Sequence, residues 1–320
     1  MEAVVADIGG THARFAIARY EQGRLLGLSD QHKLKSGDYP GLSAAWAAYG
    51  AHLARALPDR AAIAIAAPMT GAQIRLTNLP WQMERGQLAA ELGLRQLVFL
   101  NDFGALAHAV QLESDAGFQS LSGPDRPLPS QGTIAIVGPG TGLGVACLLR
   151  YPGGYRVIET EAGHIGFAPR NAVEDEILAE LREENGRVSA ERVLSGPGIL
   201  PIYRILARRS GKGMPYPDDV GVWSAALQKT DPLAQSALAH FYAIWGAVAG
   251  DFALAFGATA VVLEGGLGRR LAPGLPQSGF AKAFTDKGRY STWMADIPLK
   301  MMTRAEPALL GAASALLSST

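Results

Sequence analysis

A unit made of a β-branched strand, a glycine-rich turn and a second strand occurs twice in this chain. The first copy covers residues 4–20 with Gly9-Gly10 at its turn, and the second covers residues 133–149 with Gly140-Thr141-Gly142. In both copies the residues after the turn alternate at the period of a strand, which predicts a β-hairpin rather than a loop that opens a helix. Repetition of one unit after roughly 130 residues indicates two related α/β lobes.

Helical patterns and short apolar strands fill the rest of the chain. The predicted helices cover residues 42–57, 84–92, 103–110, 174–184, 198–209, 232–256 and 307–317. The predicted strands outside the hairpins cover residues 62–66, 97–100 and 260–263. Residues 117–132 are rich in Ser, Gly and Pro, which predicts an interlobe linker or a surface loop.

The composition is that of a soluble globular protein without a dominant charge. The 320 residues are 48% hydrophobic and 18% charged, and their formal net charge is zero. A neutral chain lacks the basic field that gathers nucleic acid or anionic membrane, so we expect no nucleic-acid partner. Cys147 is the single cysteine, which excludes an intramolecular disulfide and a zinc site built from several thiolates.

The sequence gives no sign of a secretion signal or a membrane anchor. The first residues lack a basic segment followed by an apolar one, and the most apolar long stretch, residues 243–263, is interrupted by Asp251. We therefore expect a cytoplasmic protein that does not bind membranes.

The glycine turns match neither the Rossmann nor the P-loop fingerprint. Glycines still let main-chain N–H groups approach phosphate oxygens, and Thr11 and Thr141 add hydroxyl donors at matching places. The carboxylate of Asp7 would repel a phosphate unless a cation lies between them, and Mg²⁺ is the natural mediator because it binds few protein carboxylates. The alternative is a pair of tight hairpins that hold no ligand.

Six motifs, in chain order, carry a resemblance to a known family. They are Asp7-Ile-Gly-Gly-Thr11, Leu100-Asn-Asp-Phe103, Gly138-Pro-Gly-Thr-Gly-Leu-Gly144, Glu161-Ala-Gly-His164, Ser189-Ala-Glu-Arg192 with Leu194-Ser-Gly-Pro-Gly198, and Gly265-Gly266. The sequence resembles the bacterial glucokinases, a branch without a zinc motif in the hexokinase, Hsp70 and actin ATPase superfamily. The motifs span nearly the whole chain.

This resemblance implies an α/β fold of duplicated actin-like ATPase (ribonuclease H-like) lobes, forming two domains with a cleft between them. We expect a small α/β domain at residues 1–106, a large α/β domain at residues 107–302, and a C-terminal helix within 303–320 that returns to the small domain. The implied activity is ATP-dependent phosphorylation of glucose to glucose 6-phosphate with Mg²⁺. A homodimer is the family's expected assembly.

The resemblance also assigns roles to individual residues. It implies that Asp102 is the general base on the 6-hydroxyl of glucose and that Asp7 reaches the metal. The implied sugar-binding residues are Asn78, Asn101, Asp102, Glu161, His164 and Glu191. The implied nucleotide-binding residues are Ala6, Asp7, Ile8, Gly9, Gly10, Thr11, Gly140, Thr141, Gly142, Gly265 and Gly266.

Taken without the resemblance, each of these positions has a second interpretation. Asp102 ends a predicted strand, which suits a base in a cleft, yet it would equally serve as the N-cap of the helix that follows. His164 suits hydrogen bonding to hydroxyls beside Glu161, or is a buried structural histidine. Gly163 and Gly166 argue against a helix there, and so against a metal site.

Two weaker positions also keep an ordinary alternative. Glu191 beside Arg192 near a helix start is typical of a solvated pair that suits the helix dipole. Gly265-Gly266 would let adenosine lie flat against the backbone, or form a plain turn from strand to helix.

Three alternative functions share the fold. One is an actin- or Hsp70-like ATPase module, which would not need the polar set around Asn101 and Glu161. Another is a kinase that prefers mannose, fructose or an N-acetyl sugar. The third is a sugar-responsive repressor, which we do not expect because the first strand starts by residue 4 and the cysteine-rich zinc motif is missing.

Overall fold

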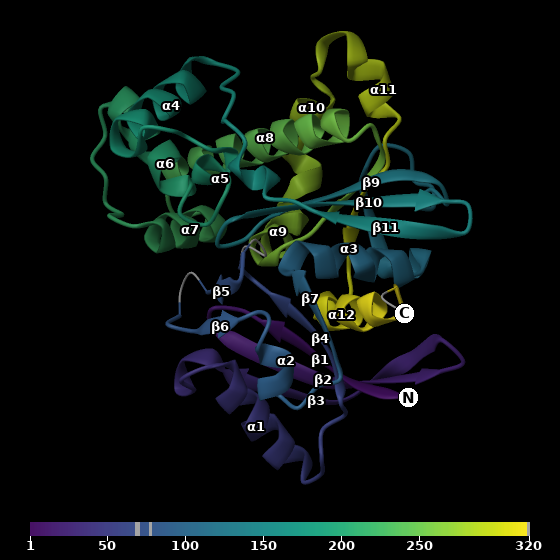
Figure 1. The fold of residues 1–320 in the computed structure, drawn as a ribbon. Coiled ribbons are helices and arrows are strands. Elements are labelled where there is room, and N and C mark those ends of the chain that lie inside the picture. Colours follow the sequence, from purple (N-terminus) through teal and green to yellow (C-terminus); the bar gives the residue numbers. More distant parts are fainter. Residues whose placement is uncertain (68–70, 77–78, 319–320) are drawn as a thin grey trace. The chain divides into compact units, whose positions relative to one another are not determined.

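The computed structural model describes residues 1–67, 71–76 and 79–318 (Figure 1). The chain forms two compact units. The first contains the described residues of Met1–Ser114, Val157–Glu159 and Arg304–Thr320, and the second contains Asp115–Arg156 and Thr160–Thr303.

A five-stranded sheet forms the centre of the first unit. Its order is β3-β2-β1-β4-β7, made of β1 (Glu2–Ile8), β2 (His12–Glu21), β3 (Arg24–Lys35), β4 (Arg60–Ile65) and β7 (Gln96–Asn101). β1, β2 and β3 pair antiparallel, whereas β1, β4 and β7 run parallel. A small separate sheet pairs β5 (Gln73–Arg75) with β6 (Gln82–Glu84).

The second unit repeats this topology. Its sheet has the order β11-β10-β9-β12-β13-β8, made of β8 (Phe118–Ser122), β9 (Gly132–Pro139), β10 (Leu143–Tyr151), β11 (Gly154–Glu159), β12 (Ala258–Leu263) and β13 (Leu299–Met302). β9 pairs antiparallel with β10 and parallel with β12, and β12 runs parallel to β13. The β1–β2 and β9–β10 hairpins are therefore equivalent, which confirms the predicted duplication.

Helices cover both faces of the first sheet. They are α1 (Leu42–Leu53), α2 (Leu88–Glu91), α3 (Asp102–Leu112) and α12 (Pro307–Ser318). α1 packs on the face formed by Val4, Ala6 and Ile8, while α12 packs on β1 and β4 from the other side and against α3 (Figure 1). Burial on both faces explains why Ala3 to Ala6, at the centre of β1, are all apolar.

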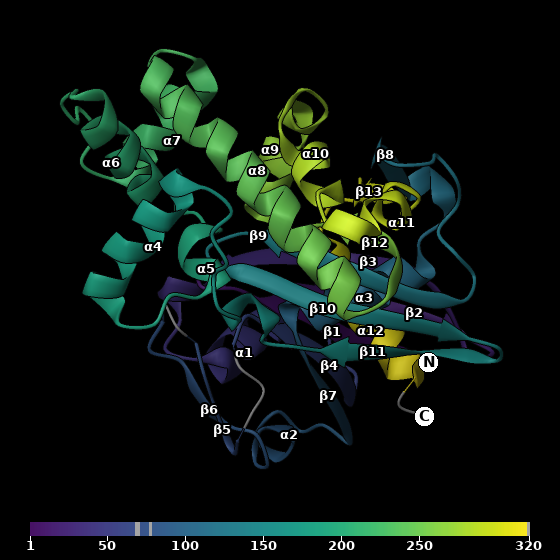
Figure 2. The same ribbon diagram turned by 90° about the horizontal axis from the view of Figure 1, so that it is seen from above.

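The long helix α8 dominates the core of the second unit. The helices there are α4 (Ala172–Asn185), α5 (Ala190–Val193), α6 (Ile199–Ser210), α7 (Asp219–Gln228), α8 (Pro232–Ala255), α9 (Gly266–Leu271), α10 (Phe280–Thr285) and α11 (Ser291–Ala295). α8 crosses β9 and β12 and packs against α6, α7 and α10 (Figure 2). Its length and apolar composition would also suit a membrane span, but 67% of its most apolar window is buried, as in a core helix.

Three predicted elements differ from the structure. The helix predicted at residues 42–57 ends at Leu53, because Ala54 turns into the left-handed region with φ of 51°. The one predicted at 84–92 is only a single turn, α2, preceded by β6. Residues 117–132 include strand β8, which pairs with β13, a partner distant in sequence that local composition does not reveal.

Candidate functional site

The turn between β1 and β2 is closed by hydrogen bonds and leaves two backbone N–H groups without a partner among the described residues. The Gly9 amide donates to the His12 carbonyl at 3.0 Å, which closes the turn. Ser36 is fully buried beneath it, where its hydroxyl donates to the Gly9 carbonyl at 2.9 Å and its amide donates to the Thr11 carbonyl at 3.0 Å. Among the described residues, nothing accepts from the amides of Gly10 and Thr11. Such consecutive unpaired amides suit an anion.

Asp7 lies next to the last residue of β1, just before the glycines, and faces Arg14 across the β1–β2 ladder. The Arg14 Nη1 donates to Asp7 Oδ2 at 3.1 Å, and the Arg14 Nε donates to Glu306 Oε1 at 2.9 Å. Burial raises the pKa of Asp7, while the Arg14 cation opposes that rise. The neighbouring Ala6 and Ile8 are fully buried, and both pair with strands β2 and β4 in the sheet.

Asn101 and Asp102 lie where β7 passes into α3. The Asn101 Oδ1 accepts from the Gly104 amide and is the N-cap of α3, and Asp102 is the first residue of the helix. The alternative that Asp102 is the cap is therefore wrong. The Asp102 carboxylate, half-buried, instead accepts from the Phe103 amide at 2.9 Å. A carboxylate in the first turn of a helix is favoured in its charged form.

Strand register brings the two halves of this first site to one edge. Ile8 aligns with Ile65 on β4, and Ile65 aligns with Asn101 on β7. The glycine turn and Asp102 therefore follow the carboxyl ends of strands that flank β4, the edge at which parallel sheets bind ligands. Asn78 lies outside the described residues.

The equivalent turn between β9 and β10 has the same character. The Gly140 amide donates to the Gly142 carbonyl at 2.7 Å, and the Gly140 carbonyl accepts from the Gly196 amide at 2.9 Å. Within the part of the chain that the structure describes, the amides of Thr141 and Gly142 donate to nothing. The backbone of this turn therefore also suits an anion.

Gly265 and Gly266 follow β12, directly beside the end of β9. The Glu264 amide donates to the Val137 carbonyl at 3.1 Å, and a Cβ on Gly138 would overlap the Glu264 carbonyl oxygen. Gly265 has φ of 96°, which favours glycine, and α9 begins at Gly266. The second glycine turn and this glycine pair therefore share one edge of the sheet.

A buried ion pair supports this edge. The Glu264 side chain is 2% exposed and accepts from Arg269 Nη2 at 2.7 Å and from the Gly265 amide at 3.1 Å. Burial raises the pKa of Glu264, and the Arg269 guanidinium opposes that rise. The pair fixes the glycine turn through the Gly265 amide.

His164 and Glu191 come together in the second unit, where Glu161 lies on the same loop as His164. Glu161 precedes a 3-10 turn at Ala162–His164, as expected from the glycines that exclude a longer helix. The His164 side chain is 57% exposed, so the interpretation as a buried structural histidine is wrong. Its Nδ1 lies 3.8 Å from Oε1 of Glu191, the second residue of α5. A carboxylate beside an imidazole suits recognition of hydroxyl groups.

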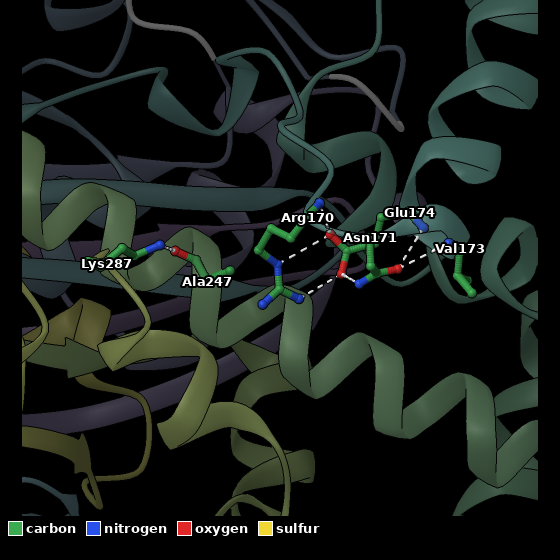
Figure 3. Close-up of polar contacts among 6 residues, drawn as sticks. All are labelled: Arg170, Asn171, Val173, Glu174, Ala247 and Lys287. Atoms are coloured by element: carbon green, nitrogen blue, oxygen red, sulfur yellow. Dashed lines mark hydrogen bonds and ion pairs between the residues drawn. The ribbon is translucent and has the colours of Figure 1, made fainter. Parts of the chain in front are cut away.

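Hydrogen bonds to two main-chain carbonyls hold the His164 loop against the segment that carries Glu191. The Ala190 amide donates to the Ile165 carbonyl at 2.8 Å, and the Arg187 Nη2 donates to the His164 carbonyl at 2.7 Å. Farther along the same loop, Arg170 and Asn171 converge on the buried carboxylate of Glu174 (Figure 3). The sugar-side residues predicted in this unit therefore stand on a fixed support.

The sequence patterns missed these supporting residues. Ser36, Arg187 and Glu264 lie outside the motifs that indicated the site. The partners of Ser36 and Arg187, Gly9 and His164, are distant in sequence, whereas the Glu264 side chain bonds to its near neighbours Gly265 and Arg269. Arg14 was visible only as a member of a strand pattern. Its position opposite Asp7 follows from the hairpin register, which would have revealed the pair.

Comparisons with known proteins agree on one family. The family model described as Glucokinase matches residues 4–319. A curated glucokinase from Zymomonas mobilis is 50% identical over 98% of this chain and 97% of its own length. The crystal structure of a glucokinase from an Antarctic psychrotroph has a TM-score of 0.86 and 32% identity, covering 100% of this chain and 99% of that one.

A more distant structure agrees in fold alone. A ROK family glucokinase from Streptomyces griseus, solved in complex with glucose and AMPPNP, has a TM-score of 0.61 at 18% identity and covers 100% of both chains. The two sheets of matching topology are those of an actin-like ATPase fold. With a family model and a close relative that both extend over nearly its whole length, the chain belongs to the glucokinase family.

Proposed function

We propose that this protein transfers the γ-phosphoryl group of ATP to the 6-hydroxyl of glucose, with Asp102 as the general base. Membership of the glucokinase family supports ATP-dependent phosphorylation of glucose. The observation that carries the finer proposal is the placement of Asp102 on the same sheet edge as the β1–β2 glycine turn. A base and a phosphate-binding turn are the two elements that phosphoryl transfer to a hydroxyl requires.

In the proposed reaction, the Asp102 carboxylate accepts the proton of the 6-hydroxyl as that oxygen attacks the γ-phosphorus. The bond between the γ-phosphorus and the oxygen bridging to the β-phosphate breaks, and ADP leaves with the electron pair. The amides of Gly10, Thr11, Thr141 and Gly142 donate to phosphate oxygens as charge moves onto them. These groups need no reorganisation, since each turn is already fixed by its own hydrogen bonds.

The residues near Asp7 fit a metal that arrives with the nucleotide rather than one held by the protein. Among the described residues, no group of three or more His, Cys, Asp or Glu side chains is placed to hold a metal ion. Mg²⁺ keeps several waters and binds one or two carboxylates together with substrate phosphates. We propose that Asp7 contacts such a Mg²⁺ through water, where the ion neutralises phosphate charge.

The sugar would be held by Asn101, Glu161, His164 and Glu191, with Asn78 as a further ligand. The Oδ1 of Asn101 is committed to capping α3, so we assign its Nδ2 to a sugar oxygen. Glu161 and Glu191 supply acceptors, and His164 supplies a ring nitrogen, which together discriminate hydroxyl positions. Adenosine would lie against Gly265 and Gly266.

An assay of sugar-dependent ADP release tests this function. The purified protein is mixed with ATP and Mg²⁺, alone or with glucose, mannose, fructose or N-acetylglucosamine, and ADP is measured by a coupled reaction. We expect release that requires glucose and is much slower with the other sugars. Equal ADP release without sugar would support the actin-like ATPase module instead, and preference for another sugar would overturn the assignment to glucose.

We further propose that the protein is a cytoplasmic homodimer with domain boundaries near residues 106 and 302. The family resemblance supports the dimer, and the neutral composition and the buried α8 support a protein in free solution. Light scattering after size-exclusion chromatography would report a mass near twice 33.7 kDa. Limited proteolysis would locate the boundaries.

A further inference from the structure

The sugar-side residues and the second glycine turn touch each other directly within the second unit. The contact is made at Leu143, the first residue of β10 after the turn Gly140–Gly142. Its amide donates to Glu191 Oε2 at 2.9 Å. The other oxygen of the same carboxylate, Oε1, is the atom that faces His164. One carboxylate therefore has one oxygen on the nucleotide side and one on the sugar side.

A second contact reaches the same residue from the opposite direction. Gly163, the middle residue of the 3-10 turn between Glu161 and His164, is buried against Leu143. A Cβ on Gly163 would overlap the Leu143 carbonyl oxygen. The Leu143 N–H group is thus hydrogen-bonded to Glu191, and the Leu143 carbonyl group packs against Gly163.

The glycine turn is shaped around this carboxylate. A Cβ on Gly142 would overlap Glu191 Oε2, so no side chain fits there unless the carboxylate moves. A Cβ on Gly140, two residues earlier in the same turn, would have no heavy atom within 4 Å. Neither glycine has a positive φ. A side chain at position 142 would therefore displace the Glu191 carboxylate, whereas the backbone conformation does not require glycine at either position.

We propose that Glu191 is a positioning residue for the second phosphate turn as well as a sugar ligand, and that it couples glucose binding to nucleotide binding through the Leu143 amide. The proposal rests on the proposed function, which makes Glu191 a sugar ligand. A sugar hydroxyl that binds Glu191 orders its carboxylate, and the ordered carboxylate holds the turn whose amides meet phosphate. Coupling of this kind is reciprocal, so nucleotide must raise glucose affinity by the same factor.

The test measures glucose affinity by calorimetry in the absence of nucleotide, on Gly142→Ala and on its matched control Gly140→Ala. We expect Gly142→Ala to raise the glucose Kd by on the order of tenfold, since the added methyl displaces Glu191, while Gly140→Ala stays within about twofold of wild type. Thermal unfolding of both variants shows that each is folded. An unchanged glucose Kd in Gly142→Ala would overturn the proposal.

A second pair of variants tests whether Gly142→Ala weakens glucose binding through Glu191 or through a general distortion of the turn. Glu191→Asp shortens the side chain and withdraws the carboxylate from the space that a methyl group on residue 142 would fill. In the Glu191→Asp protein, adding Gly142→Ala should change the glucose Kd by less than about twofold, whereas a full tenfold loss would contradict a route through Glu191. Failure of the wild-type protein to bind glucose would instead refute the proposed function.

The coupling between glucose binding and nucleotide binding can also be measured directly in the wild-type protein. Glucose affinity is compared with and without the non-hydrolysable analogue AMPPNP and Mg²⁺, in wild type and in Glu191→Asp. The proposal predicts that the gain in glucose affinity caused by AMPPNP shrinks severalfold in Glu191→Asp. An undiminished gain would show that nucleotide and sugar communicate by another route.

Discussion

Arg14 donates to Asp7 at 3.1 Å and, through its Nε, to Glu306 at 2.9 Å, so one guanidinium lies between two carboxylates. Asp7 comes from β1, whereas Glu306 comes from the segment just before α12. Burial raises the pKa of Asp7, the Arg14 cation lowers it, and the Glu306 charge raises it. The ionisation of the proposed metal-binding carboxylate therefore depends first on burial and then on two residues of opposite charge.

Replacing Asp7 should affect the metal more than the sugar. In Asp7→Asn the carboxylate is lost while the shape is kept. We expect Mg²⁺-dependent turnover to fall by about a hundredfold or more, with glucose affinity within a few fold of wild type. Titration of activity against Mg²⁺ and calorimetry with glucose check this. Equal losses in both would count against Asp7 as the metal contact.

The two partners of Asp7 should move its titration in opposite directions. Arg14→Leu removes the cation, so the pKa of Asp7 rises further and the acidic limb of the activity profile moves to higher pH. Glu306→Gln removes the carboxylate that raises the pKa of Asp7, so the acidic limb of the activity profile moves to lower pH. Profiles of kcat/KM for ATP against pH measure both shifts. Shifts of the same sign in the two variants would contradict this electrostatic account.

His108 should make the fold sensitive to mild acid. It is buried in α3, and desolvation lowers its pKa to about 4 from the ordinary 6.5. Below pH 6.5 His108 binds a proton in the unfolded chain, whereas in the folded chain it stays neutral until about pH 4. The free energy of unfolding therefore falls as the pH drops from 6.5 to about 4. The full loss is on the order of 3 kcal/mol.

Denaturant unfolding at a series of pH values between 7 and roughly 4 measures this loss. His108→Leu should flatten the decline, whereas His52→Gln, at an exposed position on α1, should keep most of it. A decline of equal size in wild type and His108→Leu would show that another group is responsible.

The Glu264–Arg269 pair should stabilise both the fold and the turn at Gly265 and Gly266, which we propose binds adenosine. Arg269→Gln leaves a buried carboxylate without its cation, and because Arg269 is 30% exposed we expect a loss of only about 2 kcal/mol in the free energy of unfolding. The Gly265 turn loosens with it, so KM for ATP should rise while the glucose Kd stays unchanged. Arg209→Gln, which breaks an exposed pair with Glu176, is the control for a lost surface charge. Equal effects of the two changes would refute this role.

Local patterns predicted the hairpins and the long helices because those signals lie within single segments. The apolar run from Ala3 to Ala6 and the glycine turn shortly after it lie in one stretch, and residues 232–256 have the apolar content of a core helix. The edge strand β8 was missed because its partner, β13, lies about 180 residues away, and its own composition is that of a loop.

Some residues of the candidate site were likewise predictable from local sequence, and others needed the structure. The residues that we propose as ligand contacts gather in short motifs, so Asp102 and the glycine turns were apparent from sequence. Supporting residues such as Ser36 and Arg187 bond to main-chain carbonyls that lie far from them in sequence, at Gly9 and His164. The identity of the N-cap also needed the structure, because Asn101 and Asp102 are adjacent and both suit that position.

The most direct measurement of the central claim is the turnover of Asp102→Asn together with its glucose affinity. The amide keeps the shape of the side chain but does not accept the hydroxyl proton. Glucose-dependent ADP release should fall by about a thousandfold or more, while calorimetry gives a glucose Kd within a few fold of wild type. Turnover close to wild type would contradict the assignment of Asp102 as the base.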